Sequence, residues 1–383
     1  MKVVRSRKMK RNSAYDLMKI ISMFLIVLCH MINHGGIIQH VTNPTLKILI
    51  QLIFLGTLVH VNSFVLVTGY YQHDKSFRAS KIWKLINASM FYKIIIMLIF
   101  VFILNHTISS LFVFKELMPF NLDEYWFIKM YIFLFFLSPF INILIKHLNQ
   151  KKHIQLLSVM FFIFSILPYV TGNQAFSNDG YTLYHFIFLY LIGAYLKKYP
   201  LQESYIFKYT SKNMFQLLCI LFFLFGWLGN FIVQQAMTTF ANTHPIVQYL
   251  SNNLMSMNLA YSNPFIIIQS ISYVLFFSTL NFHNRIITKI SALTLGVYLI
   301  HEHSLVRNQL YTWLGMTMNN ISSYSFVIKM FGVSVFVFVI CMLVELVRQL
   351  LFKLIYKQKF SQSLCNKYHL WIENLYLKSS NKN

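Results

Sequence analysis

Acidic residues are scarce in this chain. Asp and Glu make up only 10 of the 383 residues, and all charged residues together make up 11%. A soluble globular protein carries about 25% charged residues, so this scarcity excludes a soluble domain of useful size. Glycine (12) and proline (7) are also few, and they do not gather into a linker. We therefore expect a single domain over residues 1–383, with basic tails at 1–14 and 348–383.

Cysteine is too rare and too scattered to build a disulfide framework or a zinc site. The chain contains Cys29, Cys219, Cys341 and Cys365. We expect these residues to serve in packing. His34 follows His30 by one helical turn, a spacing that can bind a metal ion, but the sequence places no third ligand beside them. No metal site is therefore expected.

Hydrophobic residues fill 57% of the chain, and aromatic residues alone fill 17%. A helix needs about 20 apolar residues to cross about 30 Å of hydrocarbon. Ten segments approach that length, at 15–34, 48–71, 88–105, 126–146, 155–171, 182–196, 213–234, 263–281, 287–305 and 325–347. The sequence predicts an all-α, polytopic membrane bundle of about ten transmembrane helices.

The 33 basic residues, which give a net charge of +23, alternate along the chain. They are concentrated in both tails and in every second connection, whereas the intervening connections hold only Lys47, Lys115 and Arg307. Cytoplasmic connections of membrane proteins carry such an excess, so both termini are expected to be cytoplasmic. The charge also suits anionic lipid head groups. We expect membrane lipids, and no nucleic acid, among the partners.

The first apolar segment carries ionisable residues, which are rarely found inside a membrane without a functional or structural role because charges there are costly. Asp16, Lys19 and His30 interrupt it. Lys19 and His30 are separated by about three helical turns and fall on one face, about 16 Å apart along the axis. Ser22 and Asn33 lie close to the same stripe. This polar seam is expected to face the interior of the bundle.

A second polar group interrupts the ninth apolar segment. Thr294, Tyr298 and His301 follow one another at spacings of four and three residues, which places them on one helical face, and Glu302 is adjacent. This segment enters the membrane from the same side as the first, so His301 and His30 should lie at similar depth. The two histidines are expected to line one cavity.

Two membrane-edge stretches form a third group. The basic residues of the first suit a phosphate-bearing ligand that arrives from the cytosol, and they are Lys75, Arg78, Lys81 and Lys84. The second opens a span with Glu124, Tyr125 and Trp126. The acidic residues Glu116, Asp123 and Glu124 are expected to be solvated outer charges, with acceptor binding as the alternative. The polar segment 235–262 is expected to be an external loop, either a connector or an acceptor-binding lid.

Five short motifs, in their order along the chain, resemble those of the acyltransferase-3 family of integral membrane O-acyltransferases, especially its bacterial exopolysaccharide- and capsule-modifying members. The matching motifs are Asp16, Lys19 and His30 in the first span, Thr68-Gly69-Tyr70, Tyr125-Trp126-Phe127, Ser138-Pro139-Phe140, and Tyr298 to Glu302. The basic position of the first motif is commonly Arg in the family, whereas this chain has Lys19. The resemblance implies a location in the bacterial plasma membrane.

The resemblance also implies transfer of an acetyl or other short acyl group from acetyl-CoA or another acyl-CoA to a hydroxyl of a cell-surface or lipid-linked glycan. It implies a catalytic group of His30 as base with Lys19 and Asp16. The expected acyl-CoA ligands are the four basic residues Lys75, Arg78, Lys81 and Lys84. The expected acceptor-binding residues are Glu124, Trp126, Tyr298, His301 and Glu302.

The chemistry agrees with this function, because a buried neutral imidazole is suited to removing the proton of an attacking alcohol. Tyr298, His301 or Asn33 could stabilise the oxyanion that develops. Two other classes of protein remain open from the sequence. A transporter or flippase for a lipid-linked oligosaccharide could use the same polar seam, and a polysaccharide polymerase is also a protein with many spans.

Overall fold

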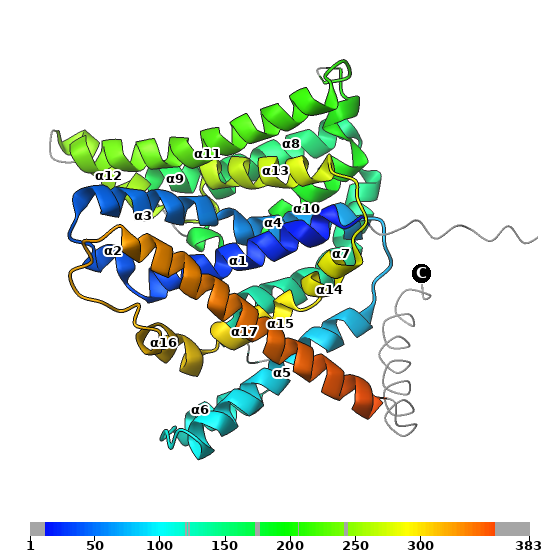
Figure 1. Cartoon of the computed structure of the whole chain (residues 1–383). Helices are drawn as coiled ribbons and strands as arrows, with labels where there is room; N and C mark the ends of the chain where they lie inside the picture. Colours follow the sequence, from blue (N-terminus) through cyan, green and yellow to red (C-terminus); the bar gives the residue numbers. More distant parts are fainter. Residues whose placement is uncertain are drawn as a thin grey trace, which may run out of the picture.

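The computed structural model describes residues 12–356, except 119–120, 122, 173–176, 206 and 241–243. Among the described residues, the chain is helical, with one isolated bridge between Val41 and Ile321. Most helices run side by side as a bundle, and α5 crosses α17 obliquely at one side of it (Figure 1). The prediction of an all-α polytopic membrane bundle is confirmed.

Within that described part, seven helical segments are long and apolar enough to cross a membrane. They are α1 (Ala14–His34), α3 and α4 (Pro44–Thr57 and Val59–Gln72), α5 (Ala79–Phe102), α7 (Trp126–His147), α8 to α9 (Gln150–Phe161, a π turn at Phe162–Ile166, and Leu167–Thr171), α11 (Lys212–Phe240) and α17 (Ser325–Tyr356). Each coincides with one of the ten predicted segments, although α5 begins nine residues before the predicted 88.

The other three predicted segments differ from simple spans. The segments 182–196 and 263–281 correspond to the shorter helices α10 (Leu183–Lys198) and α13 (Pro264–Ser278). The segment 287–305 is broken into α14 (Arg285–Ser291), α15 (Thr294–His301) and the start of α16 (Ser304–Trp313). The break matters for function, because it places the end of α15, rather than the middle of a helix, beside α1.

Connections between the spans contain short helices. These are α2 (Ile37–His40), α6 (Ser110–Leu117), α12 (Pro245–Ser256) and the 3-10 turns Asp123–Tyr125, Asn178–Gly180 and Leu201–Glu203. The expected external loop at 235–262 is largely helical, because α11 continues to Phe240 and α12 follows. The description of this segment as an extended loop was therefore wrong.

Glycine allows α4 and α10 to pack with their backbones in contact. A Cβ atom on Gly69 would lie 2.1 Å from the carbonyl oxygen of Tyr190, and one on Gly193 would lie 2.0 Å from that of Leu66. Small residues permit this close approach of helices in membrane proteins. The Thr68-Gly69-Tyr70 motif therefore has a structural reason, since it fixes α4, which forms one wall of the cavity described below.

A buried ionic group joins α17 to α5. Glu345 is 1% exposed and pairs with Arg348 through two contacts of 2.6 and 2.7 Å. The hydroxyl of Tyr92 donates to the same carboxylate at 2.6 Å. Gly296 of α15 packs directly on the Glu345 side chain. This group fixes α17 against both α5 and α15.

The helix α1 lies in the middle of the bundle and packs against α3, α4, α13, α14, α15 and α17 (Figure 1). Its Cys29 is buried, as are Cys219 and Cys341, and all three are free thiols. The packing role predicted for cysteine is confirmed for these three, whereas Cys365 and most of both basic tails lie outside the described residues.

Candidate active site

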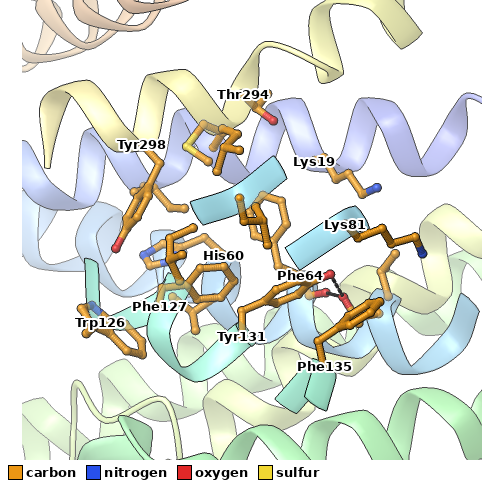
Figure 2. A pocket seen from close by; sticks show the side chains of 18 of the residues that line it. Lys19, His60, Phe64, Lys81, Trp126, Phe127, Tyr131, Phe135, Thr294 and Tyr298 are labelled. Atoms are coloured by element: carbon orange, nitrogen blue, oxygen red, sulfur yellow. Dashed lines mark hydrogen bonds between the residues drawn. The ribbon is translucent and has the colours of Figure 1, made fainter. Parts of the chain in front are cut away.

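A cavity of about 340 Å³ lies between α1, α4, α5, α7 and α15. Lys19 and Lys81 lie at one end of it, and Trp126 and Tyr298 at the other (Figure 2). Most of its wall is apolar or aromatic, and its polar lining residues are Lys19, His30, His60, Thr68, Gln72, Lys81 and Thr294. The cavity therefore follows the polar seam of α1 from Lys19 to His30, a distance of about 16 Å along the helix.

The predicted seam of α1 divides into two parts. Lys19 and His30 both line the cavity. Asp16 is 2% exposed and instead accepts hydrogen bonds from Thr288 at 3.1 Å and Ser291 at 3.3 Å. Asp16 thus fixes the end of α14 against the start of α1, and it lies about 21 Å along the helix from His30.

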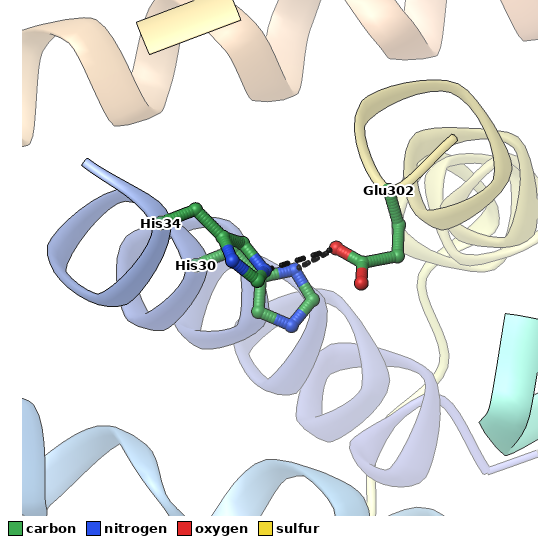
Figure 3. A group of neighbouring side chains, drawn as sticks. All are labelled: His30, His34 and Glu302. Atoms are coloured by element: carbon green, nitrogen blue, oxygen red, sulfur yellow. Dashed lines mark ion pairs between the residues drawn. The ribbon is translucent and has the colours of Figure 1, made fainter. Parts of the chain in front are cut away.

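The sequence predicted that His30 and His301 line one cavity, but His30 lines it and His301 does not. The two side chains are nevertheless in contact. Their Nδ1 and Nε2 atoms are 3.1 Å apart. The carboxylate of Glu302 lies 2.8 Å from the same Nδ1 of His30 (Figure 3). His301 and Glu302 reach His30 because α15 ends there, so that two consecutive residues face α1.

The partners of these two rings determine where the protons lie. Nδ1 of His301 faces the carbonyl oxygen of Val297, which can only accept, so His301 carries its proton on Nδ1. Its Nε2 is therefore an acceptor and receives the Nδ1 hydrogen of His30. Neutral His30 then keeps a lone pair on Nε2. This is the form that a general base requires.

The Glu302 carboxylate compensates positive charge on its neighbours. It is 4% exposed, and its other oxygen pairs with Arg307 at 2.8 Å. His34 lies 3.5 Å away (Figure 3). A proton taken up by His30 would therefore be stabilised by a buried carboxylate, as in catalytic groups where an acid orients and supports a histidine base.

His30, His34 and Glu302 also place their ligand atoms within 4.8 Å of one another. The expectation that no third ligand stands near the two histidines was therefore wrong, since Glu302 is there. The proton positions nevertheless favour a hydrogen-bonded group, because Nδ1 of His30 carries the hydrogen that His301 accepts.

Of the four predicted acyl-CoA ligands, only Lys81 lines the cavity. Lys81 lines the cavity and donates to the side chain of Gln72 at 2.9 Å. Lys75 lies over the ring of Tyr71, another lining residue, at 5.3 Å. Arg78 and Lys84 are exposed and do not line the cavity. The structure therefore adds Lys19 to Lys81 as the two cations in the cavity wall.

The predicted acceptor-binding residues also separate. Trp126 and Tyr298 line the cavity, whereas Glu124 accepts hydrogen bonds from the backbone and side chain of Ser304. Glu124 is joined there by His303 and Glu116, whose facing atoms are 3.4 Å apart. Glu116 is 2% exposed, so its expected solvation was wrong. The side chain of Asp123 lies outside the described part of the chain.

Sequence reasoning missed two residues of the site. His60 lines the cavity from α4 and is fully buried. Arg307 pairs with Glu302 from α16. The neighbours of His60 at helical spacing include only the small polar residues Thr57 and Ser63, which are common in apolar spans and do not distinguish it from a packing residue. Arg307 stands in the sequence only as an isolated charge between spans.

A model of the family described as an acyltransferase domain matches residues 12–346, which include all the residues of the site. The chain belongs to the acyltransferase-3 family. No curated protein matches it, and no solved structure matches it. In this membrane acyltransferase, the family's first-span motif supplies both a cavity-end cation, Lys19, and the histidine that Glu302 supports.

Proposed function

We propose that this acyltransferase moves an acetyl or other short acyl group from acyl-CoA to a hydroxyl of a cell-surface or lipid-linked glycan. The observation that carries the proposal is the cavity that joins two lysines to His30, whose Nδ1 faces the Glu302 carboxylate and His301. Acyl transfer needs these elements together, namely a place for a charged donor, a path for its acyl arm and a base at the end of that path.

The donor enters at the lysine end. The phosphate groups of coenzyme A would contact Lys19 and Lys81, since an ammonium group is a strong point charge for phosphate. The charge alternation of the sequence supports a cytoplasmic location for this end, on the side where acyl-CoA is made. The apolar wall between Lys81 and His30 suits the uncharged arm that carries the thioester.

The acceptor approaches from the opposite end, at Trp126. The Trp126 ring lies 4.3 Å from that of Tyr181 and 5.8 Å from that of Tyr261. Tyr181 is 42% exposed, whereas Tyr261 lines the cavity, so the three rings lead from the surface to the chamber. Large, rigid aromatic faces with polar edges suit the apolar face and hydroxyl rim of a sugar ring.

His30 joins the two substrates. Its Nε2 takes the proton of the acceptor hydroxyl while the oxygen attacks the thioester carbonyl carbon, and the Glu302 carboxylate stabilises the imidazolium that forms. The carbon–sulfur bond then breaks, and His30 returns the proton to the thiolate of coenzyme A. The products are the acylated glycan and the free thiol, and no other reactant is needed.

The test compares surface polysaccharide from cells that express the intact protein, His30→Ala or His40→Ala. The His40→Ala variant is the control, because it changes an exposed histidine outside the cavity. We expect His30→Ala to remove ester-linked acyl groups while polymer amount and length stay normal, and His40→Ala to resemble the intact protein. Loss of the polymer itself would contradict the proposal and would favour a flippase or a polymerase.

A further inference from the structure

His60 is a buried histidine whose ring nitrogens have no hydrogen-bond partner among the described residues. It lies in the first turn of α4, directly after the break at Leu58 that separates α4 from α3. The residue is 0% exposed, and neither Nδ1 nor Nε2 is within hydrogen-bonding geometry of another group. The ring packs edge-on against Tyr261 at 5.6 Å and lines the cavity beside Phe127 (Figure 2).

Such a residue is costly for the fold. A neutral imidazole always carries one N–H donor, and burial without a partner loses the hydrogen bond that the group makes with water. Other buried histidines here avoid the cost: His185 contacts the side chain of Asn62 at 3.2 Å, and His301 contacts Val297 and His30. His153 is also without a partner but does not line the cavity. A leucine at position 60 would fill the space without this cost.

The proposed reaction has a use for the unpaired donor. As the alcohol attacks, negative charge develops on the thioester carbonyl oxygen and must be met by a hydrogen-bond donor. His30 cannot supply it, because its only N–H faces His301 and Glu302. Lys19 lies about 16 Å along α1 from His30. Two donors without a partner among the described residues line the same chamber as His30, the Tyr298 hydroxyl that the sequence already suggested for this role and the ring N–H of His60.

We propose that His60 is a catalytic residue of this acyltransferase and donates its ring N–H to the oxyanion formed from the acyl thioester. The inference rests on the proposed function, because it assigns a role in the same chamber. His60 remains neutral throughout and exchanges no proton, while His30 alone takes the hydroxyl proton and returns it to the thiolate. A bound thioester would thereby provide the acceptor for this N–H.

The experiment uses the purified full-length protein in lipid nanodiscs, with acetyl-CoA as the probe and water as the acceptor, and follows release of the thiol. Four variants are compared: His60→Leu, which removes the donor, His60→Gln, which keeps an N–H, His30→Ala, and His185→Leu as a matched buried histidine. Each is also measured for its unfolding temperature and for the KM for acetyl-CoA.

We expect His60→Leu to lower kcat about 10²- to 10³-fold with an unchanged KM, and not to lower the unfolding temperature. His60→Gln should recover part of the lost rate. His185→Leu should lower the unfolding temperature, because it leaves the buried Asn62 amide without its partner. The contrast between the two leucine variants separates a catalytic histidine from a structural one.

Two results would overturn the inference. One is a wild-type kcat for His60→Leu. The other is a lowered unfolding temperature for His60→Leu together with a His60→Gln variant that is equally inactive, which would indicate a packing role. If the wild type releases thiol no faster than His30→Ala, the proposed function is wrong, and the inference about His60 is wrong with it. If the wild type and His60→Leu are equally active, only the role of His60 is refuted.

Discussion

Replacement of Glu302 by glutamine is expected to lower kcat by about 10³-fold. The carboxylate lies 2.8 Å from Nδ1 of His30, and its side chain is 4% exposed. The centres of the two charges are then about 4 Å apart, and at an effective dielectric constant of about 20 their attraction is about 4 kcal/mol. That attraction arises only when His30 takes a proton, so it stabilises the transition state rather than the bound substrate. About 1.4 kcal/mol corresponds to a factor of ten in rate.

The assay follows thiol release from acetyl-CoA by the purified protein. Glu203→Gln is the matched control, because it removes the same charge from an exposed residue outside the cavity, and it should leave kcat unchanged. The KM for acetyl-CoA should not change in Glu302→Gln, since the carboxylate is remote from the lysine end. A kcat within about threefold of the wild type, a change of less than 1 kcal/mol, would refute the argument that Glu302 supports the base.

Three further changes test the fold and the donor path. Gly69→Ala should lower the unfolding temperature and the yield of folded protein, because its Cβ would collide with the Tyr190 backbone. Gly332→Ala is the control and should lower neither, because a Cβ at Gly332 would meet open space. Equal stability of the two variants would contradict the packing argument. Glu345→Ala should lower the free energy of unfolding by about 2 kcal/mol in denaturant titration, since it leaves the partly buried Arg348 and the buried Tyr92 hydroxyl without their partner. A loss below about 1 kcal/mol would show that the ion pair is not structural. Lys81→Ala should raise the KM for acetyl-CoA without changing kcat in steady-state kinetics, and an unchanged KM would remove Lys81 from the donor site.

Sequence periodicity predicted the helical architecture because hydrocarbon imposes a length of about 20 apolar residues on a spanning helix. Seven segments met that length in the described structure. Apolar length did not predict where a helix breaks when protein, rather than lipid, surrounds the backbone. The ninth segment could break into α14, α15 and α16 because its polar ends are satisfied by Asp16 of α1 and by Glu124 of the 3-10 turn before α7.

The site was partly predictable for a related reason. Lys19, His30 and His301 are ionisable residues in apolar sequence, and such residues tend to face a cavity or one another. Similar depth and inward faces predicted that His301 lies near His30, but not that the two rings are in contact. Glu116 was not predictable, because its burial depends on α6 folding back toward His303, which no local pattern encodes. His60 needed the three-dimensional structure, since its significance comes from the absence of a partner for its ring.

The central claim is that His30 acts as the base within an internal chamber. Chemical rescue tests it most directly: the rate of thiol release from acetyl-CoA by His30→Ala is measured with and without free imidazole, after subtraction of the rate in solution without protein. The account predicts that His30→Ala lowers the rate by about 10²- to 10⁴-fold and that imidazole restores part of it by occupying the vacated space. A His30→Ala protein that retains the wild-type rate without imidazole would contradict the account.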